Sequence, residues 1–63
     1  MKLKAAKKLE RLGTRFLYGY EIMGNSSGLF EGQVMEISPS SKYIKISGMW
    51  FEIEKVTVIE ELV

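Results

Sequence analysis

The stretch that decides the fold is residues 31–62, EGQVMEISPSSKYIKISGMWFEIEKVTVIEEL. Apolar and polar side chains alternate along most of it, and a period of two is typical of β-strands. Turn-forming residues interrupt the alternation at SPSSK, residues 38–42, and again at Ser47-Gly48. We therefore expect a hairpin at each of these two points.

The alternation divides the side chains of this stretch into an inward and an outward set. The inward set is the expected core: Met35, Ile37, Ile44, Ile46, Phe51 and Ile53. The outward set contains the large residues Val34, Tyr43 and Trp50. Val34 falls on the wrong face of its strand, so either a bulge or a partner must cover it. Residues 54–56, EKV, predict a short helical corner before a last strand, TVIEEL, whose buried face the pattern leaves open.

A period of two also runs through residues 14–23, TRFLYGYEIM, where Gly19 marks a bulge or a close backbone approach. One face of this strand is expected to carry Phe16, Tyr18, Tyr20 and Ile22. Residues 24–28, GNSSG, are rich in residues that tolerate turn conformations. They predict the turn into a second strand over residues 29–38.

Residues 3–12 predict an amphipathic helix of about three turns, because they are strong helix formers without glycine, proline or β-branched residues. Its apolar stripe is expected at Ala5, Leu9 and Leu12 and continues to Phe16. Gly13 is expected to end the helix.

The chain thus reads as one domain of 63 residues, with a basic helix in residues 1–13 and a small β-barrel in residues 14–63. Five short strands joined by tight turns must curl on themselves to limit exposed edges. The expected fold is mainly β, with an N-terminal amphipathic helix followed by a five-stranded, partly open barrel. Without cysteine or histidine, no disulfide or zinc site stabilises so short a chain, which leaves regular packing or self-association.

Two segments resemble SH3-like barrels. GLFEGQVMEI, with Gly28, Gly32, Val34 and Ile37, resembles the KOW-type hairpin of ribosomal and transcription-elongation proteins. WFEIEKVTVIEEL is similar in layout to the strand, one-turn helix and closing strand that end SH3-like barrels, and a helix ahead of five strands is similar to Sm-like proteins. The resemblance implies an SH3-like fold. KOW hairpins that bind RNA carry Lys or Arg near the glycines, whereas Glu31 and Gln33 stand there in this chain, so RNA binding through the hairpin is not implied.

Charge is distributed unevenly along the chain. Residues 1–15 hold six of the nine lysines and arginines with one glutamate, a net charge of +5, whereas residues 16–63 have a net charge of −4. A basic face on the helix would suit a phosphate backbone. The candidate nucleic-acid-binding residues are Lys4, Lys7, Lys8, Arg11 and Arg15. A helix face that is simply solvated explains the same charges.

Catalytic chemistry has few candidates, because cysteine, histidine and aspartate are all absent. Glu52 and Glu54 share a strand face in the predicted alternation, but a solvated pair of carboxylates explains them without a metal or a substrate. We therefore expect no enzyme, cofactor, metal site or small-molecule substrate.

The expected function is that of a self-associating interaction module, with Val34, Tyr43 and Trp50 as the interface and a homo-oligomer or another protein as the partner. The alternative is a nucleic-acid-binding module that uses the basic helix. The chain shows no signal peptide and no run of 18 apolar residues, so we expect a cytoplasmic protein with no membrane contact.

Overall fold

The computed structural model describes residues 1–62, and for Ser26 and Ser27 the backbone alone. The order of elements is helix α1 (Leu3–Leu12), strands β1 (Arg15–Ile22), β2 (Asn25–Ile37), β3 (Tyr43–Ile46) and β4 (Met49–Glu52), 3-10 helix η1 (Ile53–Lys55) and strand β5 (Val56–Leu62). All pairings are antiparallel, in the order β4-β3-β2-β1-β5. The mainly β fold with one N-terminal helix is confirmed.

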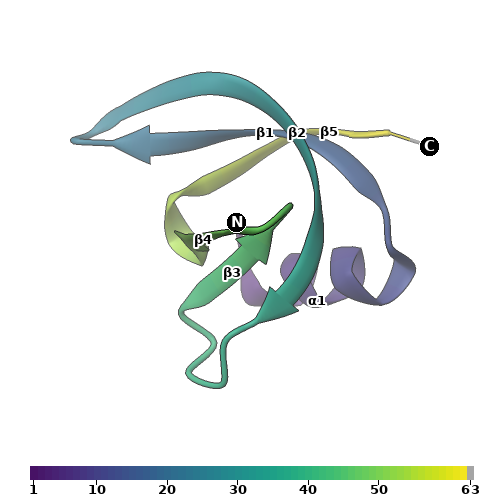
Figure 1. Ribbon diagram of the computed structural model, residues 1–63. Coiled ribbons are helices and arrows are strands. Elements are labelled where there is room, and N and C mark those ends of the chain that lie inside the picture. The colour runs from purple at the N-terminus through teal and green to yellow at the C-terminus, as the bar shows by residue number, and fades with distance from the viewer. Residues whose placement is uncertain (63) are drawn as a thin grey trace.

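The sheet is strongly curved but stays open. The long strand β2 is the central strand and arches through both halves of the sheet. Helix α1 lies across one end of the sheet (Figure 1). Strands β4 and β5 form the two edges and do not pair with each other within residues 1–62, so the sheet does not close into a barrel. The chain leaves β4 after only four residues and turns through η1 before β5 begins. The predicted helical corner at residues 54–56 corresponds to η1.

Helix α1 has the predicted bounds, and Gly13 caps it in the left-handed conformation at φ 62°. Its buried side chains are Ala6 and Leu9, which pack toward the sheet. The predicted stripe was therefore placed partly on the wrong side, because Ala5 is exposed and Leu12 is 59% exposed. Both lie toward the flank of the helix, since successive helical residues are rotated by about 100°.

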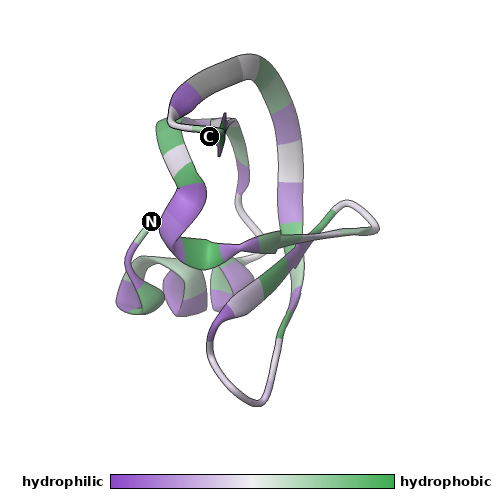
Figure 2. Cartoon of the chain, turned by 90° about the vertical axis from the view of Figure 1, so that its left-hand side faces the viewer, coloured by the Kyte–Doolittle hydropathy of each residue, from purple (hydrophilic) through white to green (hydrophobic). Residues whose placement is uncertain are grey.

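Apolar side chains from the helix, from η1 and from the sheet form one core, to which β4 contributes the partly buried Phe51. Its buried residues are Ala6, Leu9, Phe16, Tyr18, Val34, Ile44, Ile46, Ile53 and Val56. Hydrophobic and hydrophilic residues alternate along the strands that enclose it (Figure 2). Gly32 lets β2 cross this core closely, because a Cβ atom there would lie 2.5 Å from Ile46 Cγ2 and 3.1 Å from the Tyr18 ring.

A β-bulge in β2 places two neighbouring residues on the faces opposite to those predicted. Val34 pairs with Ile46 and Glu36 pairs with Lys45, so Met35 is the extra residue between these pairs. Val34 is consequently buried at 5% exposure, and Met35 is 60% exposed. The predictions of an outward Val34 and an inward Met35 were both wrong, because the extra residue at Met35 shifts the alternation by one position for the residues that precede Glu36. Of the two explanations for the position of Val34, a bulge or a covering partner, the bulge is the correct one.

The first hairpin turns earlier than predicted. The turn is Met23-Gly24, where both residues have positive φ, and Ile22 pairs directly with Asn25. This is the two-residue loop that suits the twist of a hairpin. The predicted turn at residues 24–28 was wrong, and β2 begins at Asn25 rather than at residue 29. Ile22 is exposed near this turn, whereas Phe16 and Tyr18 of the same predicted face are buried.

Three further local predictions agree with the structure. The register of β1 and β2 shifts between Tyr18 and Tyr20, at the glycine where a bulge was expected. Ser47-Gly48 forms the tight turn between β3 and β4, with φ of 47° and 94°. Residues 38–42 connect β2 to β3, where Ser38 Oγ accepts a 3.0 Å hydrogen bond from the Tyr43 amide.

Candidate interaction surfaces

The outer surface of β3 and β4 presents two aromatic residues. Trp50 pairs with Lys45, and Tyr43 pairs with Glu52. Because alternate residues of a strand face the same way, these four side chains share the outer face of the sheet. Trp50 is 47% exposed and Tyr43 is 45% exposed. The ammonium of Lys45 lies 5.9 Å from the centre of the Trp50 ring, within reach of a cation–π interaction.

The bulge extends this surface onto β2. Glu36 pairs with Lys45 on the side opposite Trp50, and the exposed Met35 precedes it. We call this surface the sheet face and define it by Met35, Glu36, Tyr43, Lys45, Trp50 and Glu52. Two of the three predicted interface residues, Tyr43 and Trp50, lie on it. The third, Val34, lies in the core.

Sequence reasoning missed Met35 as a member of the sheet face. The signal that could have found it was the position of Val34, which fitted neither face of a regular strand. A bulge at this point buries Val34 and exposes its neighbour.

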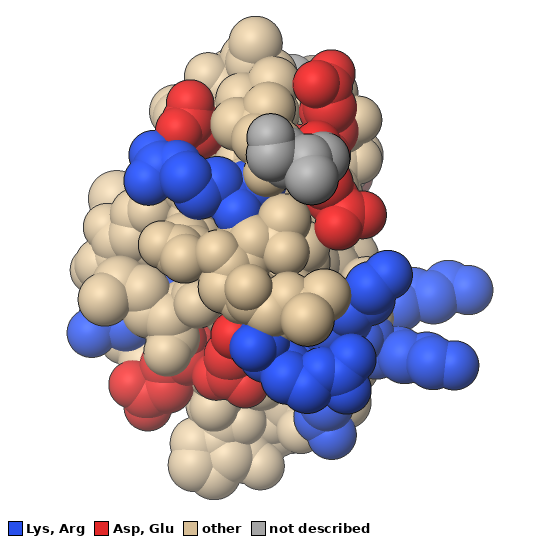
Figure 3. Space-filling model, turned by 90° about the vertical axis from the view of Figure 1, so that its right-hand side faces the viewer, with Lys and Arg blue, Asp and Glu red and all other residues tan. Residues whose placement is uncertain are grey.

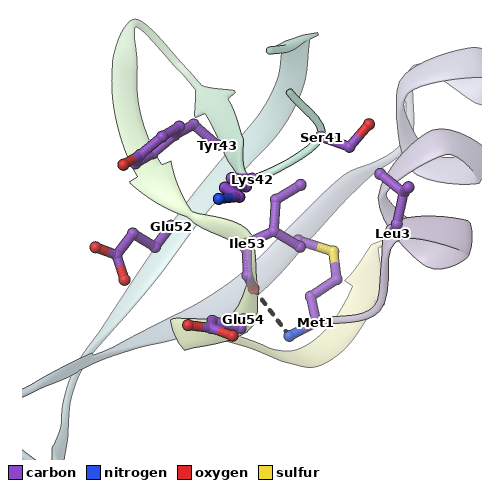
Figure 4. Close-up of a pocket in the computed structure, with 8 residues that line it drawn as sticks. All are labelled: Met1, Leu3, Ser41, Lys42, Tyr43, Glu52, Ile53 and Glu54. Carbon is purple, nitrogen blue, oxygen red and sulfur yellow. Dashed lines mark hydrogen bonds between the residues drawn. The ribbon is translucent and has the colours of Figure 1, made fainter. Parts of the chain in front are cut away.

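A hollow of about 570 Å³ lies beside the sheet face, between the start of the chain and β4 (Figure 4). Its lining is apolar at Met1, Leu3 and Ile53 and polar elsewhere, and the polar residues are Ser41, Lys42, Tyr43, Glu52 and Glu54. The Met1 nitrogen donates hydrogen bonds to the carbonyl oxygens of Ile53, at 3.0 Å, and of Val56. Burial lowers the pKa of this amino group, and the nearby carboxylate of Glu54 opposes that shift.

The solvent side of α1 carries the basic residues. Lys2, Lys4, Lys7, Lys8 and Arg11, which we call the basic face, surround Ala5 in a shallow hollow of about 560 Å³. Several lysine and arginine side chains gather toward the lower right of the view in Figure 3 and project from the surface there, and others lie apart from this group. Within residues 1–62, none of these five side chains takes part in an ion pair. The structure thus brings together Lys4, Lys7, Lys8 and Arg11, and it adds Lys2, the residue before the helix.

Arg15, the fifth predicted basic residue, is engaged elsewhere. Its Nε and Nη2 atoms donate hydrogen bonds of 2.9 and 2.5 Å to Glu31 Oε2 across β1 and β2. Both side chains are about half exposed or more. Arg15 therefore carries a local carboxylate partner, whereas the cations of α1 have none among residues 1–62.

The two glutamates considered for catalysis do not form the predicted strand pair. β4 ends at Glu52, and Glu54 belongs to η1, so the alternation of a strand does not extend to it. Glu52 lies 3.3 Å from Lys55 Nζ, and this hydrogen-bonded carboxylate raises the pKa of Lys55. Among residues 1–62 no cluster of three or more acidic, histidine or cysteine side chains is arranged to hold a metal ion.

No protein-family model matches the chain, and neither the curated proteins nor the solved structures contain a significant match. No helix in the described part of the chain is both long enough and apolar enough to span a bilayer. The chemistry of the sheet face, its neighbouring hollow and the basic face is therefore the basis for assigning a function.

Proposed function

We propose that the protein is a non-enzymatic interaction module that self-associates through the sheet face. The observation that carries the proposal is the clustering of Met35, Tyr43 and Trp50 in an exposed state on three neighbouring strands. Tryptophan, tyrosine and methionine are enriched at the centres of protein interfaces, and tryptophan and tyrosine dominate binding energy there.

The small size of the domain supports this proposal. Only nine hydrophobic residues are buried among residues 1–62, and no cysteine is present to form a disulfide. Domains of this size commonly gain stability from oligomerisation when they lack disulfides or structural metals. A second copy on the sheet face would add apolar burial that the core of one copy does not supply.

We also propose that the sheet is an open form of the SH3-like fold. The strand order β4-β3-β2-β1-β5, the 3-10 turn before β5 and the close crossing at Gly32 support this assignment. The resemblance bears on architecture alone, because function lies in the surfaces that a fold carries.

Measuring the molar mass in solution at increasing protein concentration tests self-association. We expect a rise with concentration in the micromolar range, and Trp50→Ser should reduce it while far-UV circular dichroism stays unchanged. Ile59→Ser is the matched control, because Ile59 is similarly exposed but lies on β5. A chain that remains monomeric throughout this range would contradict the proposal.

The basic face favours a second candidate function, which is binding of nucleic acid. Four of its cations, Lys4, Lys7, Lys8 and Arg11, recur over two turns of α1, and their side chains are not paired with carboxylates within residues 1–62. If all four contact phosphates, the logarithm of the binding constant for duplex DNA should fall with the logarithm of salt concentration with a slope of about −3.6.

Substitutions on α1 test the second candidate. Lys7→Glu/Lys8→Glu should remove most binding to a DNA duplex, and Arg15→Ala should change it little because Arg15 is already paired with Glu31. No detectable binding of DNA or RNA at low salt would eliminate this function.

A further inference from the structure

We propose that the hollow on the basic face receives Trp50 of a second copy of the chain, so that copies associate head to tail. This inference rests on the proposed self-association and specifies its geometry. It assigns the sheet face of one copy and helix α1 of the next as the two halves of one interface.

The hollow has the chemistry of an aromatic receptor. Ala5 is the one small residue among its lining side chains, and the others are four lysines and Arg11. The aliphatic stems of such residues form apolar walls while their charged ends stay at the rim. Cations placed over an aromatic ring attract its face, so a hollow of this kind suits a tryptophan side chain.

Trp50 has the complementary surroundings. Its ring is half exposed and already lies near one cation, Lys45. Two carboxylates share the sheet face with it, Glu52 on its own strand and Glu36 on β2. Cations that approach the Trp50 ring from outside would therefore also meet the carboxylate of Glu52 and, beyond Lys45, that of Glu36.

The basic face and the Trp50 ring of the same copy do not contact each other. Helix α1 buries Ala6 and Leu9 against the core, and its basic residues lie on the opposite side of the helix. The cation near Trp50 in its own copy is Lys45 of the same sheet, with its ammonium 5.9 Å from the centre of the ring. Because the two surfaces are different patches, their pairing is heterologous and leaves one free surface at each end of a dimer.

Charge distribution favours this orientation over a symmetric one. The first 15 residues carry a net charge of +5 and the remainder carries −4. Two sheet faces brought together would each present two carboxylates, Glu36 and Glu52, beside the cation Lys45, and two basic faces would repel, whereas a basic face is attracted to the sheet face of the next copy. The association should consequently weaken as salt concentration rises.

Mixing two variants that each lack one half of the interface tests the proposal. Lys7→Glu/Lys8→Glu disables the hollow and keeps Trp50, and Trp50→Ser does the reverse. Each variant alone should associate at least about tenfold more weakly than the natural chain. The mixture should form a 1:1 complex by sedimentation, because one intact hollow then meets one intact Trp50.

A triple variant that carries all three substitutions is the control, and it should form no complex with either partner. Arg15→Ala removes a cation that lies outside the hollow and is already paired with Glu31, so it should change association far less than Lys7→Glu/Lys8→Glu. Circular dichroism of every variant checks that the fold is retained.

The outcomes separate this inference from the function on which it rests. If Trp50→Ser weakens association while Lys7→Glu/Lys8→Glu does not, and the mixture forms no 1:1 complex, the contact is symmetric. Self-association then stands and the head-to-tail geometry is overturned. If the basic substitutions change DNA binding alone, the hollow serves a polyanion and the inference also fails. A natural chain that is monomeric at every concentration overturns both.

Discussion

Val34 on β2 pairs directly with Ile46 on β3, and both side chains lie in the core. This pairing exists because Met35 is accommodated as an extra residue in the bulge that follows. One residue thus determines which side chains of β2 stabilise the fold and which are available on its surface.

Substitution of Val34 should therefore reduce stability rather than association. Val34→Ala should lower the free energy of unfolding by about 2 kcal/mol, since it removes buried methyl groups and leaves a cavity. Chemical denaturation measures this loss. Met35→Ala is the neighbouring control and should cost less than about 0.5 kcal/mol, because Met35 is mostly exposed. Equal losses at the two positions would be inconsistent with the bulge.

Gly32 should be intolerant of a side chain. A Cβ atom there would press on Ile46 and on the Tyr18 ring, and both belong to the core. Gly32→Ala should destabilise the protein by about 1 to 3 kcal/mol through overpacking. Thermal unfolding followed by circular dichroism measures the effect. A midpoint at or above that of the natural chain would show that β2 does not cross the core this closely.

Stability should fall at alkaline pH because of Tyr18. Burial raises the pKa of its hydroxyl above the ordinary value of 10.0, so the unfolded chain loses this proton at lower pH than the folded chain. The folded state accordingly loses stability as pH rises from about 10 toward the higher pKa of the folded state. Unfolding by denaturant at a series of pH values tests this, with Tyr18→Phe as control. A loss of the same size in the phenylalanine variant would assign it to another group.

The ion pair between Arg15 and Glu31 should contribute little to stability despite its short hydrogen bonds. Both side chains are well exposed, and pairs of this kind typically contribute up to about 1 kcal/mol. A double-mutant cycle with Arg15→Met and Glu31→Gln measures the coupling, which should shrink further in high salt. A coupling that is large and independent of salt would contradict this expectation.

The sequence predicted those features that depend on local patterns. The bounds of α1, its end at Gly13, the hairpin at Ser47-Gly48 and the burial of Ile44 and Ile46 all follow from residue type and spacing. Each is determined within a few neighbouring residues, where propensity and period are strong signals.

Features that depend on pairing between strands were harder to predict. The start of β2 at Asn25 and the exposure of Met35 are set by the strands that lie alongside, which no single segment reveals. Likewise, residues 24–28 contain enough turn-forming residues to place the reversal at several points. The pairing of Ile22 with Asn25 selects Met23-Gly24.

The candidate surfaces were predicted in part for the same reason. Tyr43 and Trp50 lie on strands whose alternation is regular, and the cations of α1 follow a helical period. The partner of Arg15 was not foreseen, because Glu31 is sixteen residues away in the chain and adjacent only across the sheet.

The position of Trp50 also gives the molecule a built-in optical probe. It is the single tryptophan of the chain, and its ring lies half in solvent on the sheet face rather than in the core. Its fluorescence therefore monitors the polarity of that surface. Emission should shift to shorter wavelength when a partner covers the ring, and added quencher should then reach it less easily.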